Sequence, residues 1–519
     1  MSLKKRLTAI LILACTLAWV IYGGNREFTV PEEEHISIFN NKETIYFWYT
    51  DEALTDYMNS AAVTFGEEND VRVIPVLKSG MEYLEAVNHA SLNDDEALPD
   101  VYLLSNDSLG KAYLAGLATP IEDDSVCNTL NFPTSALSAV SYDGKLVAYP
   151  YYFETSAYLY NKTYLENFVQ AQIQAEIDAT MGEEAQEELE ENGEPAEAEE
   201  IQVNEVDVEA TVSEEEQIDP AMQEEINRRL EELLPETTEE LLTFADSYDA
   251  PEAVESILKW DVSDVFYNYY FIGQYMIVGG ESGDDADNID IYNLEAIQCL
   301  KEYQKLNQFF YIDPDTVTYD SVLQEFIDGK IVFSVVTNDA VAKLAAAREE
   351  GTFNYEYGIM PVPRISEELE GRSLSVTNTV VVNGYSSKKE LANRFATFLT
   401  TEYVDNLYSR TGKTAASNNV QFEDEHLAGF CSEYATSIPV PKMIETSNFW
   451  LQLEILFAKV WNGEDINDLV RGLSEQMMTQ VLGEPYTEEY IELPEEVVEE
   501  EGEFVDDGEG ITENDIITQ

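Results

Sequence analysis

Between residues 44 and 104 the chain alternates short apolar runs with amphipathic stretches, and this alternation sets the class of fold. Three runs rich in β-branched and aromatic residues predict strands, at residues 44–49 (TIYFWY), 71–76 (VRVIPV) and 99–104 (PDVYLL). The stretch from Asp51, a candidate N-cap, to Phe65 and the stretch from Tyr83 to Leu92 predict helices between them. Strands that alternate with helices across short turns are typical of a parallel sheet covered by helices. The sequence therefore predicts an α/β fold.

The same alternation resumes in the second half of the chain. Helices are predicted from Thr237 onward, at residues 322–326 and at residues 388–400, and strands at residues 330–336 and 375–382. With 519 residues the chain is long enough for two lobes of ordinary domain size.

Two segments break this pattern. Residues 169–235 and the tail at residues 483–519 are rich in glutamate and poor in aromatic residues. Such segments bury too little apolar surface to offset the entropy of the chain, so we expect a solvated insert, largely disordered or loosely helical, and a solvated tail. The functional alternative is that they concentrate cations or hold the body away from an anionic wall.

The formal net charge of -75 arises from 103 acidic and 28 basic residues. This balance argues against a nucleic-acid-binding protein, because no excess of Lys and Arg is available to displace counterions from phosphates.

The first 24 residues have the pattern of an export signal. Lys4, Lys5 and Arg6 precede an apolar run over residues 7–22. We expect an uncleaved membrane anchor, a polar spacer at residues 25–41 and a body on the extracellular side. Lipidation of Cys15 is the alternative, although the apolar run continues past it.

Cysteine and histidine are too sparse to build a metal or nucleophile site. Beyond Cys15 the cysteines are Cys127, Cys299 and Cys431, and the three histidines are His35, His89 and His426. None of these residues neighbours another in the pattern of a disulfide framework, a metal site or a His-based triad. We therefore expect no metal and no cofactor.

Seven short motifs occur in order along the body. They are LPDV (98–101), AYLAGLATPI (112–121), DGKLVAYP (143–150), YLYNK (158–162), FIDGK (326–330), GIMPVP (358–363) and TGKTAAS (411–417). In this order they resemble family 1 of the extracellular solute-binding proteins, typified by maltose/maltodextrin-binding protein and serving ABC transporters. The likeness extends from about residue 44 to 482, with Ala415 where the family has proline.

The resemblance implies a two-lobed, periplasmic-binding-protein-like type II fold with an interlobe cleft that closes on its ligand about a hinge. Neither lobe is continuous in the chain: lobe 1 is expected at residues 42–150 and 374–420, and lobe 2 at residues 151–373 and 421–482. The implied partners are a saccharide and the permease subunits of an ABC importer.

The cleft residues implied by this family are aromatic rings for sugar faces and carboxylates for hydroxyl groups. They are Trp48, Asp51, Asp107, Glu154, Tyr269, Tyr270, Asp339 and Trp450. The structural alternatives are core packing for Trp48, a helix N-cap for Asp107 and lobe packing for Trp450. Asp339 stands in the turn where the maltose type has a tryptophan, which favours a smaller or more polar saccharide.

Two other functions remain open at this point. A glycosidase also combines acids with aromatic rings, but carboxylate pairs are so frequent in this chain that they carry no information. A sensor or orphan binding protein for a solute other than a sugar is the second alternative. The order of the motifs favours a binding protein and not an enzyme.

Overall fold

The computed structural model describes residues 42–493, except residues 81, 94–95, 123–124, 193–219 and 423. The predicted anchor and spacer, and the tail beyond residue 493, lie outside these residues. Within the described part of the chain, no helix combines the length and the apolar character needed to cross a membrane.

The first lobe is built on the predicted parallel strands. β1 (Thr44–Tyr49) lies between β2 (Arg72–Leu77) and β3 (Val101–Ser105) and pairs in parallel with both. Helices α2 (Thr55–Asn69) and α3 (Tyr83–Leu92) connect them, as the alternation of apolar runs predicted. The carboxylate of Asp51 accepts a hydrogen bond from the amide of Ala53 and so caps the short 3-10 turn that precedes α2. The α/β prediction is confirmed.

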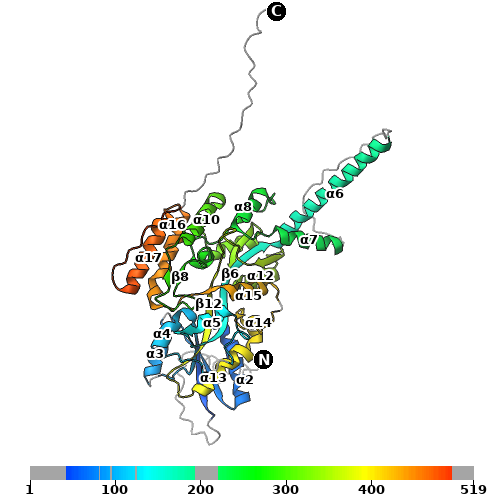
Figure 1. The fold of residues 1–519 in the computed structure, drawn as a ribbon. Helices are drawn as coiled ribbons and strands as arrows, with labels where there is room; N and C mark the ends of the chain where they lie inside the picture. Colours follow the sequence, from blue (N-terminus) through cyan, green and yellow to red (C-terminus); the bar gives the residue numbers. More distant parts are fainter. Residues whose placement is uncertain are drawn as a thin grey trace, which may run out of the picture. The chain divides into compact units, whose positions relative to one another are not determined.

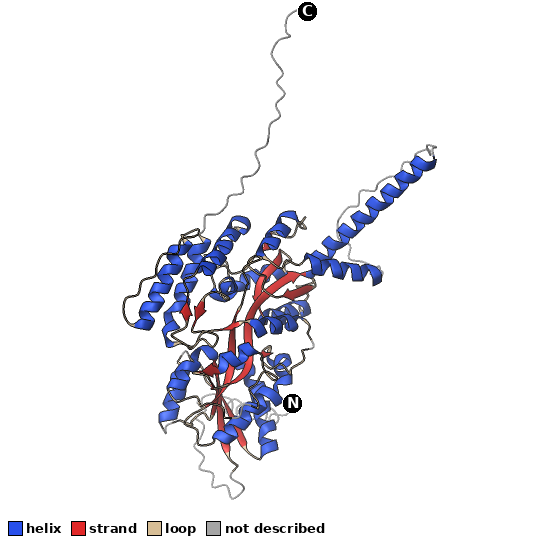
Figure 2. Cartoon of the chain, viewed as in Figure 1, coloured by secondary structure: helices blue, strands red, loops and turns tan. Residues whose placement is uncertain are grey.

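Two long strands connect this lobe to the second one (Figures 1 and 2). β6 (Tyr149–Asn161) pairs through its first half with β12 (Leu374–Val382) and through its second half with β10 (Ile331–Thr337), antiparallel in both cases. The strand order is β2-β1-β3-β12-β6-β10-β7, and β7 is Ser256–Leu258. Because β6 belongs to both halves of this path, it is the central strand of the junction between the lobes.

The remaining elements cover the two halves. Those of the first lobe are α4 (Leu109–Leu114), α5 (Thr134–Val140), β4 (Ser141–Tyr142), β5 (Lys145–Leu146), α13 (Lys389–Thr397), α14 (Leu407–Thr411) and β13 (Thr414–Ala415). Those of the second lobe are α8 (Thr238–Ser247), α9 (Val265–Asn268), β8 (Ile277–Val278), β9 (Ile289–Asp290), α10 (Leu294–Phe310), α11 (Tyr319–Ile327), α12 (Asp339–Glu349), β11 (Tyr357–Met360), α15 (His426–Thr436), β14 (Ile438–Pro439), α16 (Phe449–Trp461) and α17 (Ile466–Leu482).

The second lobe has an aromatic core. Trp260 and Trp461 are fully buried, and their rings meet edge to face with centroids 5.5 Å apart. Each indole N–H is satisfied, by the side-chain oxygen of Asn268 and by the backbone carbonyl of Ile312. Thr237 begins α8 with a reciprocal capping box to Glu240, as the sequence predicted.

The acidic insert begins and ends in helices. α6 (Lys162–Asn192) buries Val169 and Ile173 against Ile226 of α7 (Pro220–Leu233). Beyond Ile173 the described side chains of α6 are exposed as far as Met181, and Arg229 of α7 pairs with Glu176 at 2.7 Å. The ends of the predicted insert are therefore helical, and residues 193–219 lie outside the described part.

Candidate functional site

Glu154 is the exposed residue in the middle of an otherwise buried strand. Of the thirteen residues of β6, its side chain alone is exposed, whereas the neighbouring Phe153 and Thr155 are buried. A carboxylate in this position on the junction strand is the starting point of the candidate site.

Three segments bring charged groups to Glu154. The turn after β1 supplies Asp51, the residue before β13 supplies Lys413, and the start of α12 supplies Asp339. The Nζ atom of Lys413 lies 2.8 Å from Oδ2 of Asp51 and 5.5 Å from the ring centre of Tyr152. We call Asp51, Glu154, Asp339 and Lys413 the charged cluster. Its members come from both lobes and from the strand that joins them.

The electrostatics of Glu154 reflect the protein that surrounds it. Desolvation by the surrounding protein raises its pKa above the ordinary value, Lys413 opposes this effect, and the carboxylates of Asp339 and Asp51 add to it. A side chain that is open to solvent and still partly desolvated is surrounded by protein on several sides. Such a position is suited to a ligand that supplies hydroxyl donors to the carboxylate.

Asn338 fixes the geometry beside the cluster. It is buried, and its side-chain amide donates to the carbonyl of Phe153 at 3.0 Å and to the hydroxyl of Thr414 at 2.7 Å. Its side-chain oxygen accepts from the amide of Thr155 at 3.4 Å. One side chain thus ties β6, β13 and the end of β10 together. Asp339 directly follows Asn338 and Lys413 directly precedes Thr414, and both charges act on Glu154.

Two tyrosines flank Asp339. The hydroxyl of Tyr319 donates to the carboxylate of Asp339 at 2.7 Å, and the rings of Tyr319 and Tyr267 stack with centroids 5.0 Å apart. Lys343 pairs with the other carboxylate oxygen at 3.0 Å. This arrangement combines a stacked aromatic pair with an oriented carboxylate.

The structure brings Asp51, Glu154 and Asp339 together among the residues named from sequence. It places Trp48 in the core of the first lobe, 1% exposed, with the ammonium of Lys78 4.1 Å from its ring centre. Asp107 is exposed and lies within a short 3-10 turn, where it does not act as an N-cap.

The two predicted tyrosines of the second lobe are buried. Tyr269 is 1% exposed and Tyr270 is fully buried, with its hydroxyl 2.8 Å from that of Tyr158. Trp450 is half-buried and lies 5.8 Å from Tyr269 between ring centres.

Sequence reasoning did not name Tyr267, Tyr319 and Lys413. Tyr267 lies in the same aromatic run as Tyr269, two residues earlier, so its residue type gave no preference. Lys413 lies within the motif TGKTAAS, and its position directly before the strand paired to β6 was the signal that could have found it.

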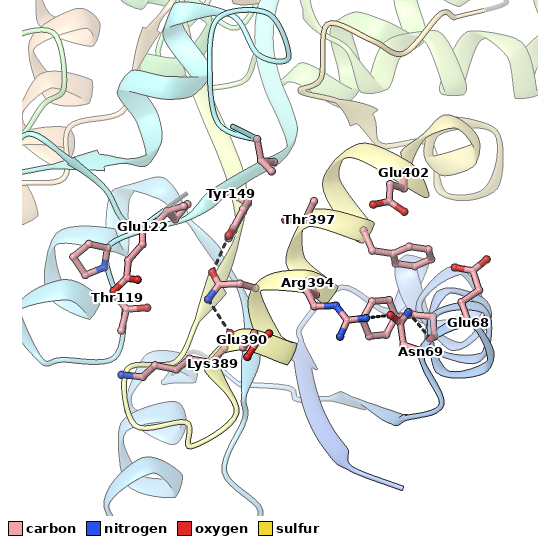
Figure 3. Close-up of a pocket in the computed structure, with 16 residues that line it drawn as sticks. Glu68, Asn69, Thr119, Glu122, Tyr149, Lys389, Glu390, Arg394, Thr397 and Glu402 are labelled. Carbon is pink, nitrogen blue, oxygen red and sulfur yellow. Dashed lines mark hydrogen bonds between the residues drawn. The ribbon is translucent and has the colours of Figure 1, made fainter. Parts of the chain in front are cut away.

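A large open cavity lies elsewhere, in the first lobe (Figure 3). It has a volume of about 1070 Å³ between the end of α2, the start of β6 and α13. Its labelled side chains include four glutamates, and the hydroxyl of Tyr149 donates to Asn393 at 2.8 Å across it. Its rings Phe65 and Phe398 are buried, so it offers no open aromatic face, and none of the residues predicted for ligand binding lines it.

Comparison with known proteins agrees with the motifs. Residues 60–183 match one family described as bacterial extracellular solute-binding protein, and residues 219–403 match a second family with the same description. The maltodextrin-binding protein MdxE of Bacillus subtilis is 21% identical over 442 residues, which are 82% of this chain and 88% of that protein.

Solved structures share the fold. An extracellular solute-binding protein of Staphylococcus aureus in complex with maltose superposes with a TM-score of 0.64 at 16% identity, covering 86% of this chain and 99% of that one. The maltose-binding protein MalE of Listeria monocytogenes, also with maltose, gives 0.60 at 18% identity and covers 86% of this chain and all of that one. The two-lobed fold is thereby confirmed, and the two matched segments, which together make up the greater part of the chain, both resemble bacterial extracellular solute-binding proteins.

Proposed function

We propose that this protein captures a saccharide between its lobes and delivers it to the permease subunits of an ABC importer, without chemical turnover. The observation that carries the proposal is Glu154, an open and partly desolvated carboxylate on the junction strand, with Asp51, Asp339 and Lys413 around it. Among similar proteins, one is a maltodextrin-binding protein and others hold maltose or maltotetraose.

The charged cluster supports this class of ligand through its chemistry. Carboxylates accept hydrogen bonds from sugar hydroxyls, and the Lys413 ammonium donates to sugar oxygens. Trp450, which is half-buried, is the candidate aromatic surface for the C–H face of a sugar ring. Asp339 favours a small or polar saccharide over a long maltodextrin.

The membrane anchor is part of the same proposal. Lys4, Lys5 and Arg6 ahead of the apolar residues 7–22 favour a body held on the extracellular face of the membrane. The family's extracellular character supports this location.

Isothermal titration of the full chain with maltose, maltotetraose and a panel of smaller saccharides tests the assignment. We expect binding of at least one saccharide and recovery of that saccharide unchanged. Glu154→Gln is expected to weaken binding by roughly 10- to 100-fold, because hydrogen bonds to a charged group contribute about 1.5–3 kcal/mol. Glu350→Gln, an exposed position on another surface, is the matched control.

Two results would overturn the proposal. Stabilisation by amino acids, peptides or metals alone would reject the saccharide. Cleavage of a bound saccharide would reject the binding-protein role in favour of a glycosidase.

A further inference from the structure

Lys442 is a fully buried lysine at a seam between the two lobes. It follows β14, and its exposed fraction is 0%. The described residues give its ammonium two acceptors, both backbone carbonyls: Ser138 of α5, at 2.9 Å, and Ser282 of the loop between β8 and β9. The first acceptor belongs to the first lobe and the second to the second lobe, so one buried cation contacts both.

The seam around Lys442 is tightly closed. The backbone amide of Lys442 donates to the carbonyl of Gly283 at 2.6 Å. A Cβ atom at Gly110 of α4 would lie 2.5 Å from the carbonyl oxygen of Lys442, and one at Gly283 would lie 2.6 Å from Cα of Pro441. Close to the lysine, the backbone amide of Asp143 in the first lobe donates to Oδ2 of Asp284 in the second lobe at 2.6 Å. Water therefore has little access to the ammonium while the seam is closed.

The seam lies on the face of β6 opposite to the charged cluster. Side chains alternate along a strand, so Phe153 points away from the face that carries Glu154. Phe153 stacks on Tyr434 of α15 with centroids 3.9 Å apart, and Ser135 of α5 donates to the carbonyl of Tyr434. Ser138, the partner of Lys442, is one helical turn further along α5. Rotation of the lobes about β6 that narrows the cluster side therefore opens the seam.

A cation buried against neutral carbonyls is costly, because the carbonyls replace its hydration only in part. Burial lowers the pKa of Lys442 to about 8, and Asp284 opposes this effect. Of the packed elements, α5 carries no ionisable residue, and α4 carries exposed Lys111 and part-buried Tyr113. Besides Asp284, the loop between β8 and β9 carries Glu281, Asp285 and Asp287, which are all exposed. Asp143 and Glu445 lie around the phenol of Tyr142 in the neighbouring hairpin.

We propose that the buried charge of Lys442 destabilises the closed seam and thereby favours closure of the lobes on the opposite face. When the seam opens, the ammonium regains water and its affinity for a proton returns toward that of a free lysine. The protonated protein therefore opens the seam more readily than the neutral one, by at most roughly 300-fold for the difference between 10.5 and about 8. The link to ligand capture rests on the proposed function, whereas the opening of the seam does not.

The sign of the pH dependence follows from this linkage. Below about pH 8 both forms of the seam carry the proton and the opening equilibrium is constant. As the pH rises from about 8 toward 10.5, the closed seam loses its proton first and becomes favoured.

Amide hydrogen exchange of the full chain, without ligand and normalised for intrinsic rates, tests whether charged Lys442 destabilises the closed seam. The peptides to follow cover residues 138–147 and 279–288, and a peptide from β10 reports whether the fold is intact. In the wild type we expect seam protection to rise at least tenfold between pH 7 and pH 9.5. Lys442→Met, of similar length and without charge, is expected to raise seam protection at pH 7 at least tenfold and to abolish its pH dependence.

The controls separate the outcomes. Lys459→Met, on the exposed face of α16, is expected to match the wild type. If Lys442→Met lowers seam protection while β10 stays protected, Lys442 stabilises the closed seam and the proposal is wrong. If the variant fails to fold, the wild-type pH series decides. Seam protection that is constant or falls between pH 7 and pH 9.5 rejects the proposal. Because no saccharide is added, these results are independent of the proposed ligand.

Discussion

The fold disfavours the ionised form of Glu154. Desolvation raises its pKa, so the folded protein binds a proton at this residue more tightly than the unfolded chain does. The contribution of Glu154 to stability is therefore greatest below the unfolded pKa of 4.5 and is lost as the pH rises through the folded pKa. At neutral pH the residue is retained at a cost in stability, as expected for a group kept for its ligand.

Glu154→Gln is therefore expected to leave the free energy of unfolding at pH 7 unchanged or to raise it, although saccharide binding is weakened. The variant is also expected to show a smaller decline in stability between pH 4.5 and pH 7, because it removes a group that releases its proton in this window. Urea unfolding at several pH values measures both effects, with Glu350→Gln as the control. A clear loss of stability at pH 7 would show that Glu154 is a structural residue.

For the candidate site, the structure groups three of the predicted acids but buries most of the predicted rings. Glu154 stood out because a carboxylate directly after Tyr151-Tyr152-Phe153 has no place in a buried strand. Trp48 and Tyr270 belong to apolar runs in which side chains alternate between two faces, and residue type does not show which face is covered.

At the scale of elements, the junction depends on one side-chain amide that bonds to two strands at once. Asn338 bonds to the backbone of β6 through both ends of its side chain and to Thr414 of β13. The strands and helices of the junction follow from apolar periodicity. The sequence could not show that one asparagine would serve partners so distant in the chain, because hydrogen bonds of this kind depend on the tertiary arrangement.

Replacing Asn338 by alanine is expected to lower the free energy of unfolding by about 2–3 kcal/mol, because buried backbone and hydroxyl groups lose their partner. Urea unfolding measures this change. Asn462→Ala is the matched control, since this asparagine is exposed at the end of α16 and bonds only within its own helix among the described contacts. Equal stabilities of the two variants would show that water replaces the amide at the junction.

At the scale of the whole molecule, charge opposes compactness. A net charge of -75 on one chain produces repulsion that is not confined to any pair of residues. Dissolved ions screen this repulsion over a Debye length of about 10 Å at 0.1 M ionic strength. The folded protein is therefore expected to be more stable in salt than in dilute buffer.

Raising sodium chloride from 10 to 300 mM is expected to increase the urea concentration at the midpoint of unfolding, because the unfolded chain separates its charges and the folded chain does not. Choline chloride at the same ionic strength should give the same increase if screening is the cause. A midpoint that is constant or falls with salt would contradict this view and show that attractive ion pairs, such as Lys413 with Asp51, dominate instead.

The position of β12 in the strand order also determines when the first lobe can finish folding. β12 fills the place between β3 and β6, yet it is synthesised after both of them and after β10 of the other lobe. A nascent chain therefore reaches residue 374 with the sheet of its first lobe still incomplete, and closing that gap requires contacts distant in sequence, which form slowly. The first lobe can therefore complete its sheet only after most of the second lobe has been synthesised.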